Sequence, residues 1–316
     1  MNEKRMCDVG EIGVLRGVLP GLRQGGDVVT GPGDDCAVLR VDGWEWDLLA
    51  TSDPVIEGHH YVAGTPWEWV ARKAVGRSVS DIAAMGGTAR WVLTDVTAPA
   101  GMGAEEIGEL YRGLEKAARE LGVSIVGGDL AAAGEVQVHV TALGTCGKGM
   151  AVLRSGARPG DVVFVTGRLG ASWAEGNPHQ FLFEPRLKEG RWLAEKGFAD
   201  SMMDISDGLG KDLPRLLDAS GGLGCRIWPE RLPVSEAALK AGGDPVRHAW
   251  DDGEDFELLF TVRSEKREAL EREWAARFPE LELTAVGEVT GAGEARVFAG
   301  EDGVRAFPDG GFEHFK

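Results

Sequence analysis

Apolar runs alternate with helix-like stretches along the chain, so the hydrophobic pattern predicts a mixed α and β protein. Thr65-Pro66 is typical of a helix N-terminus, and Gly86-Gly87 is typical of a helix end. After an amphipathic segment at 10–22, the expected helices cover 65–85, 104–121, 212–219 and 264–276. The expected strands are 46–50, 91–97, 124–126 and 136–144, followed by strands near Val162, Met202, Leu258 and Leu283.

The length of the chain and a change in composition near its middle predict two domains. The 316 residues are enough for two ordinary cores. A turn-rich connector covers 154–161, and a new apolar strand follows it. We therefore expect one domain at 1–150 and another at 151–316.

Composition and charge narrow the class of protein. The chain is 43% hydrophobic and 27% charged, as in soluble globular proteins. Its net charge of -17 disfavours nucleic acid as a partner, although metal ions could bridge its carboxylates to phosphates. No apolar run is long enough for a membrane span, and the N-terminal residues lead into no signal-peptide core. With four scattered cysteines and no close CxxC pair, we expect a cytoplasmic protein without a zinc site.

Aspartates beside Gly, Ser or Thr recur at six places where turns or strand ends are expected. They occur in Gly33-Asp34-Asp35, Thr51-Ser52-Asp53, Ser80-Asp81, Gly127-Gly128-Asp129, Asp204-Ile205-Ser206-Asp207 and Gly253-Glu254-Asp255. Desolvating a carboxylate is costly unless a cation or hydrogen bonds compensate it. Several such residues in one chain therefore indicate a site for more than one hard divalent cation, Mg²⁺ or Ca²⁺.

Each of these segments also has a purely structural interpretation. Gly31 to Asp35 could be a surface turn, and the segments at 51–53 and 204–207 could be Asx-turns or helix caps. Asp81 is harder to explain in this way, because it lies in a helix-like stretch of small and apolar residues. It faces either a partner or a cation, and we favour the cation. The glycines before Asp129 could form a turn or let a nucleotide approach the backbone.

Several common catalytic motifs are missing from the sequence. The chain has no GxxxxGK[ST] phosphate loop, no GxSxG elbow and no HExxH pair. A Walker-type kinase is therefore disfavoured.

The order of the motifs resembles the thiamine-monophosphate kinase family of the aminoimidazole ribonucleotide synthetase-like superfamily. The matching segments run almost from end to end: GDDCAVL (33–39), TSDPVIEGHHY (51–61), SDIAAMGG (80–87), VGGDL (126–130), RSGARPGDVVFVTGRLG (154–170), MDISDGLGKDL (203–213), GEDFELLFTV (253–262) and GFEHF (311–315). The MDISDGL and GEDFELLF pair, with the terminal GFEHF, points to the thiamine branch.

The resemblance implies an α+β protein with two domains, each a mixed or antiparallel sheet packed with helices. It also implies transfer of a phosphoryl group from ATP to thiamine monophosphate, directly and in line, with several Mg²⁺ ions. Members form homodimers through their N-terminal domains and bind substrates in the cleft between domains. No residue acts as a covalent nucleophile, and the ionised acceptor phosphate needs no general base.

The family's site residues can be carried over to the matching positions of this sequence. The implied metal ligands are Asp35, Thr51, Ser52, Asp53, Asp81, Asp129, Asp204 and Asp207. The implied ATP contacts are Gly128, Asp129, Arg154 and Ser206, and the implied substrate contacts are His60, Glu254 and Phe312. Asp34 is interpreted as a turn residue, and Glu254 is expected near the positively charged thiazolium ring.

The chain departs from the family pattern at three places. Arg77 stands where Asn is usual, Phe312 stands where Trp or Tyr is usual, and Gly170 is followed by Ala171-Ser172-Trp173 in a segment that looks shortened. These changes leave a sister ATP-dependent activity open, such as aminoimidazole ribonucleotide or selenophosphate synthesis. A hydrogenase-assembly partner would call for a C-terminal Cys, whereas the sequence ends in Lys316. A purely structural binding module would leave the aspartates unexplained.

Overall fold

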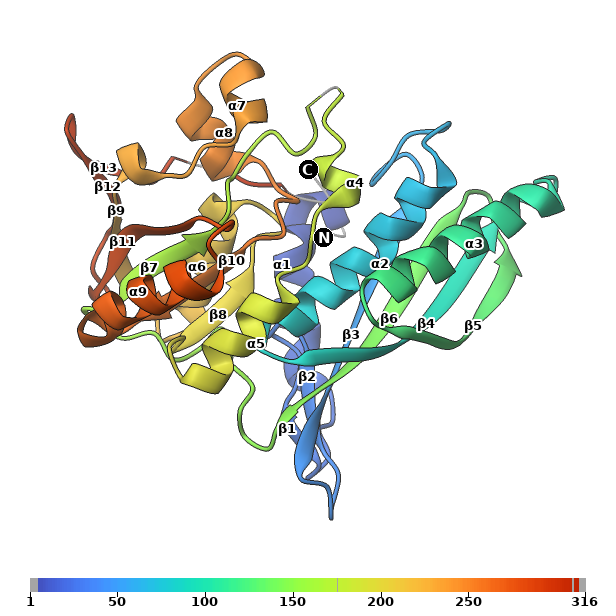
Figure 1. The fold of residues 1–316 in the computed structure, drawn as a ribbon, viewed down its shortest axis with the longest axis horizontal. Coiled ribbons are helices and arrows are strands. Elements are labelled where there is room, and N and C mark those ends of the chain that lie inside the picture. The colour runs from blue at the N-terminus through green and yellow to red at the C-terminus, as the bar shows by residue number, and fades with distance from the viewer. Residues whose placement is uncertain (1–4, 175, 309, 313–316) are drawn as a thin grey trace.

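The computed structural model describes residues 5–174, 176–308 and 310–312 as two mixed sheets with helices packed against them (Figure 1). The first sheet has the order β1-β2-β3-β6-β4-β5, and the second has the order β13-β12-β9-β11-β7-β10-β8. The strands of the first sheet are β1 (Val28–Thr30), β2 (Ala37–Arg40), β3 (Trp46–Ile56), β4 (Thr88–Ala98), β5 (Ser124–Ala132) and β6 (Gln137–Gly147). The strands of the second are β7 (Val162–Thr166), β8 (Ser201–Asp204), β9 (Leu223–Ile227), β10 (Leu258–Val262), β11 (Leu283–Ala292), β12 (Arg296–Gly300) and β13 (Gly303–Ala306).

Most neighbouring strands are antiparallel. The exceptions within the sheets are β4 with β5 and β12 with β9, which are parallel. The α+β class and the mixed sheets expected from the sequence are therefore confirmed. The helices are α1 (Met6–Val18), α2 (Trp67–Ala84), α3 (Ala104–Glu120), α4 (His179–Leu182), α5 (Leu187–Lys196), α6 (Leu209–Ala219), α7 (Glu236–Lys240), α8 (Pro245–Asp251) and α9 (Arg267–Arg277). Short 3-10 turns occur at Leu19–Gly21, Pro229–Arg231 and Ser264–Lys266.

Helix α2 is the element that joins the two halves of the molecule. It packs with α3 across one face of the first sheet, and its other neighbours are α4, α5 and β8 (Figure 1). Val75, Val79 and Ile82 of this helix are fully buried in the first core. Because α2 touches both halves, polar residues on it can meet residues from the second sheet.

The second sheet is covered on both faces, which explains why its central strands are apolar without alternation. Leu213 and Trp250, from α6 and α8, belong to the core on one face. Leu193 and Trp274, from α5 and α9, belong to the core on the other. The strands of the two sheets come from 28–147 and 162–306, and the division into domains near residue 150 stays a prediction.

Two strands extend beyond the ends expected from the sequence. Strand β3 continues through Thr51-Ser52-Asp53 to Ile56, because it stays paired with β6 over its whole length. Strand β5 continues through Gly127-Gly128-Asp129 and is largely exposed, whereas we expected a short buried strand before a glycine turn. The prediction failed because glycine and aspartate usually end strands, while here pairing with β4 keeps the segment extended.

Helix boundaries agree more closely with the sequence. Helix α2 begins at Trp67, one residue after the proline that we expected as its first helical residue. Pro66 is instead the N-cap, and Thr65, the expected N-cap, donates a hydrogen bond to the carbonyl of Val62. Gly86 has a φ of 70°, as the predicted helix end requires. Among the residues that the structure describes, no helix is both long enough and apolar enough to cross a bilayer.

Candidate functional site

Three carboxylates from separate segments meet where the two halves of the molecule join. Asp35 lies in the turn before β2, Asp81 in the last turns of α2, and Asp204 at the end of β8. One oxygen of each lies within 4.8 Å of the others, and Asp81 and Asp204 have the additional partners Thr51 and Ser80. We call Asp35, Asp81 and Asp204 the acid cluster.

The acid cluster is electrostatically unfavourable without a cation. Burial, with repulsion from Asp53, Asp204 and Asp35, raises the pKa of Asp81 well above its usual value. Burial and repulsion from Asp35 likewise raise the pKa of Asp204. The C-terminal turn of a helix also carries partial negative charge, which destabilises an ionised Asp81 further. A divalent cation would compensate all of these costs at once.

The hydroxyl groups at the cluster do not provide such compensation. Thr51 donates to Asp81 at 2.6 Å, and Ser80 donates to Asp204 at 2.5 Å. These hydrogen bonds fix the orientation of two carboxylates but supply no positive charge. The nearest arginine, Arg154, pairs with Asp35 through two hydrogen bonds of 2.8 and 3.2 Å.

Asp53 lies beside the cluster with one oxygen uncompensated. It shares a face of β3 with Thr51, because side chains alternate along a strand. One of its oxygens is 3.8 Å from Arg77, whereas the other is buried without a hydrogen-bond partner among the described residues. An orphaned buried carboxylate oxygen beside three further acids fits the oxygen ligands that Mg²⁺ prefers.

The other implied metal ligands lie apart from the acid cluster. Ser52 is on the opposite face of β3, exposed and 3.1 Å from the hydroxyl of Thr141. Asp129 is exposed on β5, where it pairs in register with Asp95. Asp207 forms an ion pair of 2.7 Å with Arg215. These three residues are therefore not part of the acid cluster, and their role as metal ligands stays a prediction.

Asp34 has a larger structural role than the turn residue we expected. Its carboxylate accepts the backbone N–H of Arg154 at 3.1 and 3.2 Å, which ties the turn before β2 to the connector between the sheets. Burial and repulsion from Asp35 raise the pKa of Asp34 to about 6. The turn therefore places Arg154 beside the cluster.

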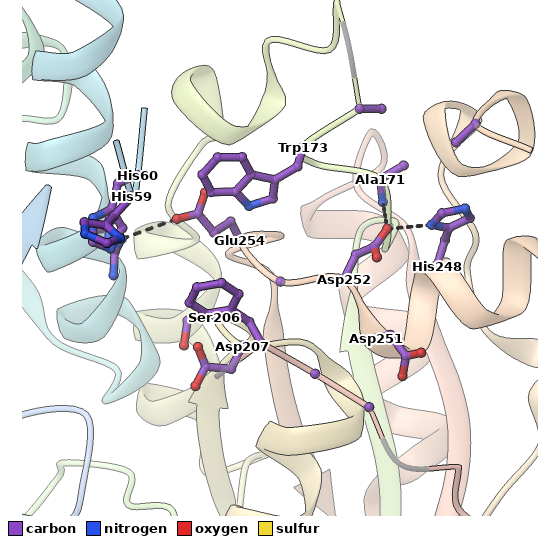
Figure 2. A pocket seen from close by; sticks show the side chains of 17 residues that line it. His59, His60, Ala171, Trp173, Ser206, Asp207, His248, Asp251, Asp252 and Glu254 are labelled. Carbon is purple, nitrogen blue, oxygen red and sulfur yellow. Dashed lines mark hydrogen bonds and ion pairs between the residues drawn. The ribbon is translucent and has the colours of Figure 1, made fainter. Parts of the chain in front are cut away.

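A cavity of about 550 Å³ brings together residues implied for the nucleotide and for the substrate (Figure 2). Its lining includes Ser206 and Asp207 after β8, His60 after β3, and Glu254 and Phe312. A volume of this size suits a small-molecule ligand. The backbone N–H of Glu254 donates to the carbonyl of Ser206 at 2.7 Å, and that of Phe312 donates to the carbonyl of Asp207 at 3.0 Å. Residues 313–316, which complete the terminal motif, lie outside the described residues.

Glu254 is already neutralised by two basic residues on α2. Lys73 lies 2.5 Å from one of its oxygens, and Arg77 lies 3.3 Å from the other. Burial lowers the pKa of Lys73 to about 8, although Glu254 opposes this effect. Glu254 therefore shares its charge with two cations of the chain, and its expected place near a thiazolium ring stays a prediction.

Sequence reasoning missed several residues that support the site. Asp212, which is fully buried, accepts the backbone N–H groups of Ser206 and Asp207 at 3.0 and 2.9 Å. Burial and repulsion from Asp207 raise the pKa of Asp212 to about 7. Its place one turn into α6, within the MDISDGLGKDL motif, was the available signal. Lys73 gave no signal, because nothing in the sequence indicates that a helical lysine will be fully buried.

Comparison with known proteins identifies the family. Residues 33–146 match the family described as AIR synthase related protein, N-terminal domain. The thiamine-monophosphate kinase of Rhodopirellula baltica is 35% identical over 302 residues, which cover 91% of this chain and 92% of that protein. The chain belongs to the thiamine-monophosphate kinase family. It is therefore an enzyme of a phosphotransferase family, and the resemblance seen in its motifs is confirmed.

Other members and solved structures agree with this assignment. The thiamine-monophosphate kinase of Halobacterium salinarum is 36% identical over 299 residues, with 92% of this chain and 96% of that protein covered. The structure described as AaThiL complexed with AMPPCP and TMP has a TM-score of 0.82 and 27% identity, covering 99% of this chain and 100% of that one. The fold expected from the resemblance is thus confirmed.

Proposed function

We propose that this enzyme transfers the γ-phosphoryl group of ATP to thiamine monophosphate, forming thiamine diphosphate. The observation that carries the proposal is the convergence of Asp35, Asp81 and Asp204, because Asp204 directly precedes the segment that brings Ser206 and Asp207 to the cavity wall. The family assignment and the relative complexed with AMPPCP and TMP support the same nucleotide and acceptor. We propose that the enzyme is located in the cytoplasm.

The acid cluster and Asp53 are the residues that we propose to hold Mg²⁺. When bound, Mg²⁺ neutralises phosphate charge, so that two polyanions can approach each other. The cluster draws its carboxylates from the turn before β2, from α2 and from β8, so both halves of the chain must be in place to form it. Thr51, Ser52, Asp129 and Asp207 remain proposed ligands of further ions.

The chain's own residues position the reacting phosphates. We propose that Arg154 binds an ATP phosphate with its fork-shaped guanidinium, which Asp35 holds in place at 2.8 Å. Gly128 and Asp129 are proposed to approach the nucleotide, and the Ser206 hydroxyl to bind a phosphate. An ionised acceptor phosphate can attack directly and in line, so positioning and charge compensation account for catalysis without a covalent intermediate.

We also propose that the enzyme is a homodimer formed through the first sheet. Trp91, Leu93 and Leu143 alternate with fully buried valines and alanines along β4 and β6, and they remain only half-buried in the single chain. Covering such a face with a second copy would remove its apolar surface from water. Size-exclusion chromatography with light scattering should give twice the mass of one chain, and Leu143→Glu should shift it toward the monomer. A wild-type monomer at micromolar concentration would contradict the dimer.

The function is tested by incubating the purified enzyme with ATP, Mg²⁺ and thiamine monophosphate. We expect thiamine diphosphate and ADP in equal amounts by chromatography, and no product when thiamine replaces its monophosphate. Addition of EDTA should stop the reaction. Absence of thiamine diphosphate from wild-type reactions would refute the proposed acceptor.

A further inference from the structure

The strap at Gly170 to Trp173 crosses one wall of the cavity and is fixed by two aspartates. The backbone N–H of Gly170 donates to Asp255 at 3.0 Å, and the Ser172 hydroxyl donates to the same carboxylate at 2.7 Å. The N–H of Ala171 donates to Asp252 at 2.7 Å, as Figure 2 shows. Hydrogen bonds to Asp252 and Asp255 therefore fix the backbone of the strap before Trp173.

Backbone strain is concentrated around the same wall. Among the described non-glycine residues, positive φ angles occur at Ala171, Glu254 and Phe256, and the first two line the cavity. Such conformations cost about 1 to 3 kcal/mol each and persist only where the surroundings impose them. The constrained backbone at Ala171 helps to fix the position of Trp173, which lies two residues further along the strap.

Trp173 is a large aromatic side chain left open at the cavity. It is 45% exposed although it lines the cavity together with Glu254, and the two side chains lie next to each other in Figure 2. The ammonium of Lys73 lies 4.3 Å from the centroid of its ring. Lys73 is itself fully buried and bound to Glu254 and to the carbonyl of His60. The indole of Trp173 thus contacts the ammonium of a buried ion pair, and its exposed surface is available to a ligand.

We propose that Trp173 is a specificity-determining residue that stacks on a flat heteroaromatic ring of the acceptor. This inference rests on the proposed function. It places the ring of the acceptor against Trp173 at the cavity wall, and the phosphates of the substrates near Ser206 and Asp207. Indole is suited to this role, since it offers a large rigid surface at a small cost in conformational entropy. The strap that carries Trp173 is also one of the three places where the sequence departs from the family pattern.

The ion pair under the indole explains why Glu254 need not contact the ring directly. Lys73 and Glu254 compensate each other at 2.5 Å, and they support the indole without placing a free charge on the ligand. Recognition of the ring then depends on stacking area. A ligand with a ring of similar size but no positive charge should therefore also bind.

The test compares Trp173→Leu and Trp173→Phe with the wild type in steady-state assays of thiamine diphosphate formation. We expect Trp173→Leu to raise KM for thiamine monophosphate roughly tenfold or more, because base–aromatic stacking contributes at about this level. Trp173→Phe should keep most of the affinity, since it retains a ring. KM for ATP and the melting temperature should change little in either variant, because Trp173 is half exposed and lies outside the proposed nucleotide contacts.

Trp44→Leu is the matched control, because Trp44 is a comparably exposed tryptophan on the hairpin before β3, and all its kinetic constants should stay unchanged. An unchanged KM for thiamine monophosphate in Trp173→Leu, with an active wild type, would overturn the stacking role alone. Equal rises in KM for both substrates would overturn it too. A wild type that forms no thiamine diphosphate would instead refute the proposed function, and the stacking role with it.

Discussion

Replacing Asp81 by Asn should make the metal-free protein more stable while it removes activity. Asp81 is buried in the acid cluster, and its pKa is raised by burial and by neighbouring carboxylates. Asn has nearly the same shape, and its oxygen can still accept the hydrogen bond from Thr51. The substitution therefore removes charge and changes little else.

The size of the effect follows from the distances within the cluster. The oxygens of Asp81 and Asp204 are at most 4.8 Å apart, and two unit charges at that distance repel by about 3.5 kcal/mol at an effective dielectric constant of about 20. Repulsion from Asp35 is partly offset by Arg154, so we count only the first pair. For a chain of this size, a relief of this order corresponds to a rise in melting temperature of roughly 5 °C.

The pH dependence has a definite sign. A carboxyl group with a raised pKa in the folded state holds its proton there longer than in the unfolded chain. Its destabilising effect is therefore absent below about pH 4, the usual value for Asp, and grows as the pH rises toward the folded-state pKa. The stability gained by Asp81→Asn should be seen at pH 8 and should vanish near pH 4.

The assay is thermal unfolding at pH 8, first with EDTA and then with increasing Mg²⁺. The wild type should gain stability with Mg²⁺ by mass action, whereas Asp81→Asn should start higher and gain little. Its formation of thiamine diphosphate should fall by at least roughly a hundredfold, since compensation of phosphate charge is lost. Asp42→Asn, which removes an exposed acid before β3, is the matched control and should behave as the wild type. The reasoning would be refuted by an Asp81→Asn variant that is less stable in EDTA and gains as much from Mg²⁺ as the wild type does.

Three further substitutions test other parts of the structure. Gly128→Ala should lower the free energy of unfolding by about 2 to 4 kcal/mol in urea titrations, because a Cβ would lie 2.0 Å from the carbonyl oxygen of Thr94 and the φ angle is 148°. Gly127→Ala, whose Cβ would meet only a flexible side chain, should lower the free energy of unfolding much less. Arg154→Lys should raise KM for ATP roughly tenfold in initial-rate assays, since lysine cannot form the two-pronged contact; an unchanged KM would count against its role. His248→Gln should destabilise the protein at pH 5.5 more than at pH 9, because hydrogen bonds to a carbonyl and a carboxylate raise the pKa of His248. The stabilisation by the protonated imidazole is present below about pH 6.5 and is lost as the pH rises through the folded-state pKa. Equal losses of melting temperature at both pH values would contradict this assignment.

The sequence predicted the elements whose signals are local. Helices α2 and α3 end close to the expected glycines, because a left-handed residue after a helix needs little context. The strands at Val162 and Leu258 were predicted from their apolar runs. The extension of β3 and β5 through Asp-containing segments was not predictable, since it depends on pairing with strands distant in the sequence.

For the site, the sequence by itself determined which residues are chemically unusual. Aspartates beside small residues, and the buried setting expected for Asp81, marked the cation-binding chemistry without any coordinates. Only the tertiary structure decided which of them act together: Asp35, Asp81 and Asp204 meet, while Ser52 and Asp129 do not join them. It also decided that Glu254 is neutralised by Lys73 and Arg77 and that Trp173 stands open beside them. The physical reason is that residue chemistry is local, whereas charge compensation depends on distances of a few ångströms between segments that only folding brings together.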